Sequence, residues 1–397
     1  MMAAAAKLFV DHEAIASNTR WFVDHVQGDV MAVVKDDAFG HGDVLRTVLD
    51  AGASWLGLAT LPEALAVREQ TAAAGTPILC WVVTPDDDHD AAVRSDIDLA
   101  VSDEWQLHAI AAAGRRAGVA ARVHLFIDVG LSRDGADASH WAPLCDMARH
   151  HERAGSVEVV GVMGHFSSAD EPGAERTAVE ELRYRNALRA ARRRGLRPTA
   201  LHLAATAGTV TGASAGTGCS LARIGAGLFG IDPSGTTDEL RPAMTLTTTV
   251  AFTRPVGAGT GVGYGHDHVT DRATTLATLP LGYADGLPRT ASGRAEVQIR
   301  GRRHPVVGRF SMDMVVVDVG REGIAPGEPV TVFGPGAQGE PTVAEWAAWA
   351  TTIPHDIVTS VGSRVSRVAR IPVPVEPAQP AASCASAPSP APRRVLA

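Results

Sequence analysis

The chain has 397 residues, of which 45% are hydrophobic and 20% are charged, so it can bury a large core. Its formal net charge is −8 and no block of five like charges occurs, which disfavours nucleic acid and anionic membranes as partners. No apolar run approaches the ~20 residues of a membrane span, the N-terminus lacks a secretory pattern and the cysteines form no CxxC pair, so we expect a cytoplasmic protein.

Eight short apolar runs occur before about residue 230, each followed by an alanine-rich, charged stretch with helical periodicity. Eight such runs alternating with helices predict a closed (β/α)8 barrel over residues 1–240, with an open doubly wound sheet as the alternative. The barrel is favoured because polar residues follow several runs, and a barrel gathers these residues at one mouth. The runs lie at 30–34, 55–60, 77–83, 97–101, 122–128, 157–165, 200–204 and 221–230.

After Arg241 the pattern changes to short strands separated by turn residues, with one clear helix in VAEWAAWA. This pattern predicts a mainly-β domain over residues 241–372. Residues 373–397 are rich in proline, alanine and serine, and such a segment cannot bury enough surface to offset its chain entropy. The fold class is therefore α/β, a TIM-type barrel followed by a mainly-β domain and a disordered tail.

Lys35 stands where the first apolar run gives way to a glycine-containing loop, in AVVKDDAFGHG. A lone lysine in a loop is most often a solvated charge. At the carboxyl end of a barrel strand, however, it would project into the mouth, where a partly desolvated amine can lose its proton and form a Schiff base.

The segment around Lys35 resembles the motif AVVKANAYGHG, which carries the pyridoxal 5′-phosphate (PLP) lysine of alanine racemases. Four further segments match that family in order: LARIGAGLFGIDPS, GVGYGHD, LGYADGLPR and VGRFSMDM. Ordered matches over both domains make coincidence improbable. The chain is identified as a divergent member of the alanine racemase family, whose barrel is of the PLP fold type III.

The resemblance implies two bases, Lys35 and Tyr264, that act on opposite faces of an α-carbon. The ordinary pKa of a tyrosine, ~10, is too high for a base near neutrality, so a cationic or hydrogen-bond-donating neighbour must stabilise the phenolate. By resemblance that neighbour is His165; without it, Tyr264 is a turn-packing residue and His165 a core histidine. In the family the tyrosine comes from the partner subunit, so we expect a head-to-tail homodimer with shared sites.

Arg223, by resemblance, points at the pyridine nitrogen of PLP. Because a guanidinium can only donate, it keeps this nitrogen unprotonated and makes the ring a weak electron sink, which favours proton removal and return. The GxGxxG pattern at 225–230 lacks the following helix and acid of a dinucleotide site. By resemblance, Gly225, Ala226 and the hydroxyl of Thr206 hold the PLP phosphate instead.

The resemblance also implies residues for the substrate. Arg133 matches an arginine that contacts the PLP phenolic oxygen and the substrate carboxylate, although alone it reads as an exposed loop charge. Met312 would offer its backbone N–H to the carboxylate, and Asp313 would orient that loop. Phe39 and His355 replace tyrosines that reach the phosphate in the family, so weaker cofactor binding is expected unless His355 compensates.

We therefore expect a PLP-dependent isomerase acting on a small amino acid, with conversion of L-alanine to D-alanine as the first expectation. Phe126 also stands where many members have a lysine that can be carbamylated. Because this change and those at Phe39 and His355 alter the inner rim of the pocket, a racemase or epimerase for serine or another amino acid of specialised metabolism is the alternative. An aldolase or decarboxylase on the same fold and a PLP-binding protein without turnover are weaker alternatives. No metal is expected, because HDH at 266–268 and the pair at 150–151 lack zinc-site spacing.

Overall fold

The computed structural model describes residues 6–368, and its first domain is a barrel of eight parallel strands. The predicted (β/α)8 barrel is confirmed, and each predicted apolar run overlaps one strand. The neighbours follow the order β8-β7-β6-β5-β4-β3-β2-β9, and backbone hydrogen bonds from Ser220 to Leu201 (2.9 Å) and from Arg223 to Ala204 (3.1 Å) join the two ends. The strands are β2 (Asp29–Val33), β3 (Trp55–Thr60), β4 (Ile78–Val82), β5 (Ile97–Val101), β6 (Ala121–Phe126), β7 (Val157–Met163), β8 (Ala200–His202) and β9 (Leu221–Ile224).

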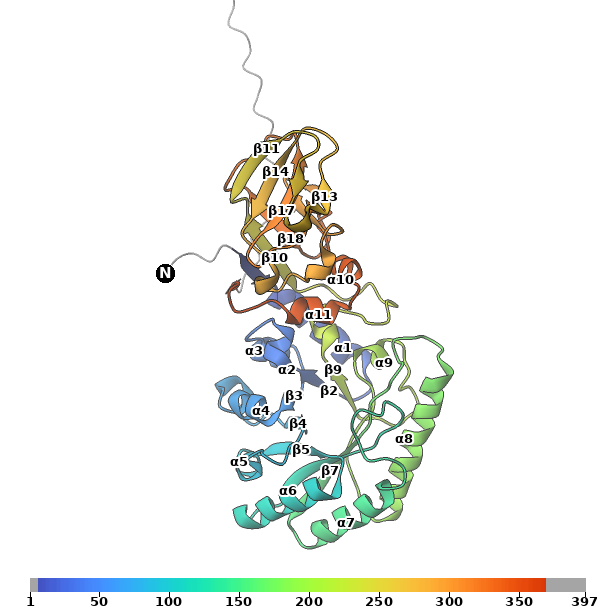
Figure 1. The fold of residues 1–397 in the computed structure, drawn as a ribbon. Coiled ribbons are helices and arrows are strands. Elements are labelled where there is room, and N and C mark those ends of the chain that lie inside the picture. The colour runs from blue at the N-terminus through green and yellow to red at the C-terminus, as the bar shows by residue number, and fades with distance from the viewer. Residues whose placement is uncertain (1–5, 369–397) are drawn as a thin grey trace, which may run out of the picture.

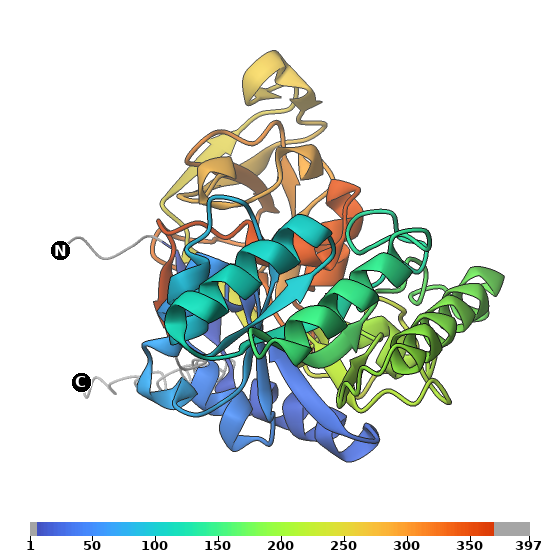
Figure 2. The ribbon, with the colours of Figure 1, turned by 90° about the horizontal axis from the view of Figure 1, so that it is seen from below.

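Helices cover the outside of this barrel, as expected for strands that are apolar on both faces (Figures 1 and 2). In Figure 2 the helices drawn in teal and green, α6 to α8, lie across the outer surface. Three of these helices begin at aspartate caps: the carboxylates of Asp11, Asp88 and Asp103 accept the N–H groups of Ala14, Ala91 and Trp105. The helices are α1 (His12–His25), α3 (Leu45–Asp50), α4 (Leu61–Arg68), α5 (His89–Arg94), α6 (Glu104–Ala117), α7 (Trp141–Arg153), α8 (Glu175–Arg193) and α9 (Thr206–Val210).

The last apolar run, 221–230, is only partly strand. β9 ends at Ile224, and the 3-10 helix η2 (Ala226–Phe229) follows it. The glycines of this run therefore lie at the rim of the barrel rather than in its wall, where the backbone can approach a ligand.

The second domain is built on a nine-stranded sheet of order β11-β14-β17-β16-β15-β18-β10-β1-β19 (Figure 1). A small two-stranded hairpin, β12–β13, is separate from this sheet. The strands of this domain after residue 240 are β10 (Met244–Thr249), β11 (Phe252–Val256), β12 (Gly261–Val262), β13 (His268–Val269), β14 (Thr274–Leu279), β15 (Glu296–Ile299), β16 (Arg302–Val307), β17 (Val315–Gly320), β18 (Pro329–Phe333) and β19 (Ser366–Val368). The expected helix is α10 (Val343–Ala350), and α11 (Pro354–Thr359) was not expected because six residues are too few for a periodic pattern.

The first strand corrects one expectation. β1 (Lys7–Val10) pairs antiparallel with β10 and parallel with β19, so the start of the chain belongs to the sheet of the β domain, although residues 1–240 were assigned to the barrel. The reason is that pairing between strands more than 200 residues apart leaves no local pattern. The predicted disordered tail, 373–397, lies outside the described residues.

None of the helices within residues 6–368 combines the length and the apolar character that a bilayer span requires.

Candidate active site

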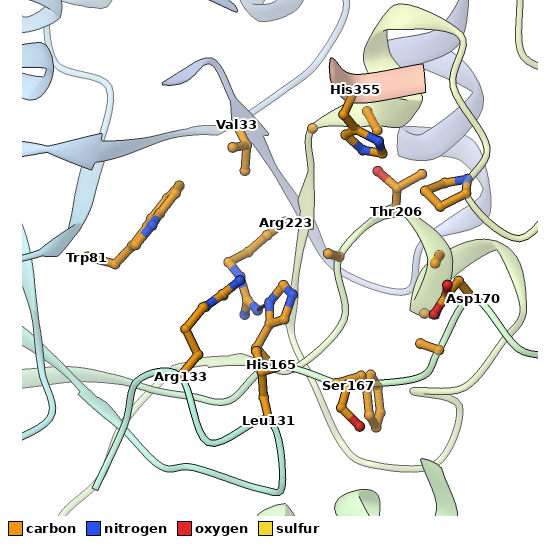
Figure 3. Close-up of a pocket in the computed structure, with 18 of the residues that line it drawn as sticks. Val33, Trp81, Leu131, Arg133, His165, Ser167, Asp170, Thr206, Arg223 and His355 are labelled. Atoms are coloured by element: carbon orange, nitrogen blue, oxygen red, sulfur yellow. Dashed lines mark hydrogen bonds between the residues drawn. The ribbon is translucent and has the colours of Figure 1, made fainter. Parts of the chain in front are cut away.

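A cavity of about 400 Å³ opens at the carboxyl ends of the barrel strands, and it brings together nine of the twelve predicted site residues (Figure 3). They come from β9, from the segments that follow β2, β6, β7, β8 and β9, and from α11 of the β domain. The gathering of polar residues at one barrel mouth is thus observed. The nine residues are Lys35, Phe39, Arg133, His165, Thr206, Arg223, Gly225, Ala226 and His355.

Lys35 opens a strained turn. In α2 (Lys35–Phe39) the four residues after the lysine have φ between 53° and 55°, which is a left-handed turn without glycine. This conformation costs roughly 1–2 kcal/mol per residue, so the surroundings must hold it. Glu63 accepts the backbone N–H of Asp36 at 2.7 Å, and the side chain of Lys35 stays 35% exposed with its amine 3.8 Å from the Asp36 carboxylate.

His41 and Arg367 hold the other end of this turn. The Nδ1 of His41 bonds the carbonyls of Ala38 and Phe39 at 3.0 Å, and Arg367 donates to the carbonyl of Gly40 at 3.1 Å. Burial lowers the pKa of His41 to about 4, so it is a neutral donor. The strain beside Lys35 is therefore held by both domains, because Arg367 lies in β19.

Arg223 and His165 form the polar centre of the cavity. The Nη2 of Arg223 lies 3.1 Å from Nδ1 of His165 and 2.7 Å from the carbonyl of Gly164. Burial, together with the positive charges of Arg223, Arg133 and Lys35, lowers the pKa of His165 to about 3, so this ring is neutral. Because the guanidinium donates to Nδ1, the proton of His165 is on Nε2, where it can be donated to a further group.

The opposite end of the cavity has the features of a phosphate site (Figure 3). Thr206 begins α9 and its hydroxyl accepts the N–H of Gly227 at 3.1 Å, while the buried Nδ1 of His355 has no hydrogen-bond partner within the described residues. A Cβ at Gly225 would lie 2.9 Å from the Phe39 ring, so only glycine keeps the backbone and this ring together. Burial and nearby Lys35 lower the pKa of His355.

The remaining three predicted residues lie outside this cavity, in the β domain. Tyr264 is 65% exposed in a turn between β12 and β13. Met312 is 53% exposed, and Asp313 pairs with Arg364 at 2.7 Å. One chain therefore presents the lysine side of the predicted site, and its tyrosine points to solvent.

Several residues of the site were not expected from the sequence. Trp81 and Met163 line the cavity, and Glu63, His41 and Arg367 hold the lysine turn. For Trp81 and Met163 the sequence offered one signal: side chains alternate between the two faces of β4 and β7, and these two are on the inward face. Glu63, His41 and Arg367 had no such signal. Within residues 6–368, no group of three or more His, Cys, Asp or Glu side chains is placed to hold a metal ion.

A barrel that presents a lysine, an arginine and a neutral histidine at its mouth, followed by a β domain, defines a two-domain barrel enzyme with a lysine-centred site. Comparison with known proteins gives the family. Residues 10–233 match the model of the alanine racemase N-terminal domain, and residues 243–369 match that of the C-terminal domain. The chain belongs to the alanine racemase family.

Similar proteins cover nearly the whole chain. An alanine racemase of Frankia casuarinae is 45% identical over 90% of this chain and 94% of its own length. The structure of the alanine racemase of Streptomyces coelicolor A3(2) superposes with a TM-score of 0.90 at 40% identity, covering 92% of this chain and 98% of that one. One from Bartonella henselae, with covalently bound pyridoxal phosphate, superposes with a TM-score of 0.83 at 25% identity, covering 92% and 100%. At these identities the chain need not be described as divergent.

Proposed function

We propose that this chain is a PLP-dependent alanine racemase, an isomerase that interconverts L-alanine and D-alanine. One observation carries the proposal: Lys35, His165 and Arg223 line one cavity, in a chain whose relatives are alanine racemases. The expected cytoplasmic location remains a prediction.

PLP fits the residues of the cavity. Lys35 supplies an amine, and Thr206, the backbone at 225–226 and the unpartnered Nδ1 of His355 suit a phosphate at the other end. When bound, PLP withdraws electron density from the α-carbon of the substrate and so makes its proton acidic.

Arg223 decides which reaction follows. Burial lowers the pKa of its guanidinium to about 10, so it remains protonated near neutrality and can only donate. Placed against the pyridine nitrogen of PLP, this donor would keep that nitrogen unprotonated and would limit how much negative charge the ring accepts. Return of a proton to the α-carbon is then favoured over transamination or decarboxylation.

Two proton carriers are needed for inversion, and we assign these roles to Lys35 and to the partner subunit's Tyr264. The exposure of Tyr264 in a single chain supports this arrangement, since the cavity is lined by the barrel and α11 of the same chain. In a head-to-tail homodimer, each hairpin would reach the other subunit's mouth. In that arrangement His165, with its proton on Nε2, would donate to the phenolate and stabilise it.

Arg133 and the backbone N–H of Met312 remain the proposed contacts of the substrate carboxylate, and Asp313 remains the residue proposed to orient the loop of Met312. Arg133 lines the cavity on the side of His165 and Arg223 (Figure 3). The ion pair of Asp313 with Arg364 gives that loop a fixed geometry.

The test is to incubate purified protein containing PLP with each alanine enantiomer in deuterated water. We expect both to lose optical activity while the α-carbon takes up deuterium, and Lys35→Ala to lose at least ~10³-fold in rate. Serine and other small amino acids in parallel would test the alternative substrates. If protein with PLP bound inverts neither alanine enantiomer, the proposal is wrong.

A further inference from the structure

A row of hydrogen-bonded polar side chains runs across the inside of the barrel to Arg223. The Nη1 of Arg223 lies 3.0 Å from Nδ1 of His202, and Nε2 of His202 lies 2.8 Å from Nδ1 of His124. The Nε2 of His124 lies 3.0 Å from one carboxylate oxygen of Asp98, and Nε of Arg122 lies 2.7 Å from the other. The exposed fractions of Asp98, His124 and His202 are 1%, 0% and 0%.

The barrel wall is shaped to hold this row. β7 lies between the strands of the two histidines, and there Gly161 faces the ring of His124 so closely that any Cβ would collide with it. The pairing of β6 with β7 shifts its register between Val123 and His124, and the Trp55 ring packs edge-on to His124 at 5.6 Å. Buried polar groups are costly unless all are bonded, so a row with these local adjustments is an organised feature of the fold.

The hydrogen bonds of this row can be donated in only one direction, from Arg223 towards Asp98. A guanidinium only donates, so Nδ1 of His202 accepts, and burial lowers the pKa of His202 well below its ordinary value, so this ring is neutral. Its single proton is therefore on Nε2, and Nδ1 of His124 must accept it. The proton of His124 is then on its Nε2 and is donated to the Asp98 carboxylate.

Asp98 supplies the negative end of the row. Burial opposes its ionisation, but hydrogen bonds from His124 and Arg122 outweigh this effect and hold the pKa of Asp98 below its usual value. Arg223, at the other end, is a buried cation whose hydrogen-bond partners within residues 6–368 are all uncharged: His165, His202 and two carbonyl groups. The carboxylate polarises both rings and so makes Nδ1 of His202 a stronger acceptor for the guanidinium.

We propose that Asp98, acting through His124 and His202, is a positioning residue that fixes one tautomer of each histidine and so aims Arg223 as a donor. Neither Asp98 nor His124 lines the cavity, so their effect reaches the reaction only through Arg223. The consequence for racemisation rests on the function proposed above. The tautomers themselves are independent of that function.

The first test replaces Asp98 by asparagine. The amide N–H of Asp98→Asn can donate to His124, which reverses both rings and places a protonated Nδ1 of His202 against the guanidinium. We expect kcat for alanine to fall about 10- to 100-fold, the range seen when the outer partners of metal-binding histidines are lost, while KM and PLP content change little. The matched control is Asp90→Asn, which weakens the peripheral pair of Asp90 with Arg116 and should leave kcat unchanged. An equal kcat for Asp98→Asn and the wild type would contradict the proposal.

A double-mutant cycle separates positioning from mere stability. In His202→Asn the amide oxygen can still accept from Arg223, but the connection to His124 is lost. If Asp98 acts through the row, adding Asp98→Asn to this variant should cause no further fall in kcat. If the two losses in kcat instead multiply, Asp98 acts by another route and the proposal is wrong.

The tautomers can be observed directly in the wild-type protein by ¹⁵N NMR of labelled histidine. We expect His124 and His202 both to carry their proton on Nε2, and both to change to Nδ1 in Asp98→Asn. A proton on Nδ1 of His202 in the wild type would overturn the proposal even if racemisation is confirmed. The expected tautomers in a protein without racemase activity would sustain it and refute only the proposed function.

Discussion

The barrel interior and the β12–β13 hairpin present their polar groups in opposite ways. Arg223 is 5% exposed and bonded to His202, His165 and two carbonyl groups, so its position is set by the barrel of one chain. Tyr264 is 65% exposed, although the ion pair between Arg309 and Asp267 holds the turn that carries it. The barrel residues of the proposed site are thus fixed by contacts within one chain. The β12–β13 turn is also fixed, but its tyrosine side chain is exposed to solvent and lies outside the cavity of the same chain.

A subunit-mixing experiment tests whether the exposed Tyr264 acts in the barrel site of the partner subunit, and it should give the largest effect. Tyr264→Phe and Lys35→Ala should each lose racemase activity, the first by about 10²–10⁴-fold because a proton carrier is removed. When the two variants are mixed at equal amounts and exchange subunits, half of the dimers are mixed, and each mixed dimer has one intact site. Racemisation should therefore return to about a quarter of the wild-type rate if the sites are shared between subunits. A mixture that recovers nothing would show that Tyr264 does not act across the interface.

The rigidity of the barrel side can be tested at Gly161. In Gly161→Ala the new Cβ would collide with the His124 ring and lie 2.8 Å from the Ala200 carbonyl, so we expect a loss of about 1–3 kcal/mol in the free energy of unfolding. Gly257→Ala is the matched control, since a Cβ there meets nothing within 4 Å, and its effect should stay within about 0.5 kcal/mol. Urea unfolding measures both, and equal effects would show that the wall is not tightly packed at this point.

The buried histidine beside the lysine turn predicts a pH dependence. Since the pKa of His41 falls from 6.5 to about 4 on folding, the unfolded chain takes up a proton between these pH values while the folded chain does not. The contribution of His41 to the free energy of unfolding should therefore be highest above pH 6.5. It should fall by about 1.4 kcal/mol per pH unit as the pH decreases from 6.5 towards 4. His41→Asn keeps a donor near Nδ1 and cannot titrate, so urea titrations at pH 7.5 and 5 should show a smaller decrease. An unchanged decrease would mean that His41 is not held neutral.

The smallest effect concerns the phosphate end of the cavity. Phe39→Tyr adds one hydroxyl at the end of the cavity that His355 lines. A new hydrogen bond of ~0.5–1.5 kcal/mol from this hydroxyl to the PLP phosphate should tighten PLP binding about 2- to 12-fold. Phe252→Tyr, on the exposed strand β11, is the control and should not change the affinity. Absorbance titration of the protein freed of cofactor measures both. Weaker binding in Phe39→Tyr would indicate that the Phe39 ring itself shapes the site against Phe229, 5.2 Å away.

Much of the barrel was predictable because its strands are covered on both faces. Each of the eight apolar runs overlaps a strand, and polar residues at the carboxyl ends of several of these strands meet at one cavity. The pattern did not indicate that β1 would join β10, since the two strands are 234 residues apart (from Val10 to Met244) and their pairing depends on the closed barrel between them. Asp98, His124 and His202 each interrupt an apolar run, but one polar residue in a strand does not indicate by itself which distant side chain it bonds.

The sequence by itself determined the alternation of strands and helices, the ordered motifs of the family and the positions of Lys35, Arg223 and Tyr264, because periodicity and motif spacing are local properties of the chain. Only the tertiary structure decided that four non-glycine residues after Lys35 turn left-handed, that His165 is neutral, and that Arg223 is bonded to a row of histidines. These features depend on burial and on contacts between residues far apart in the chain, and neither exists until the barrel has closed.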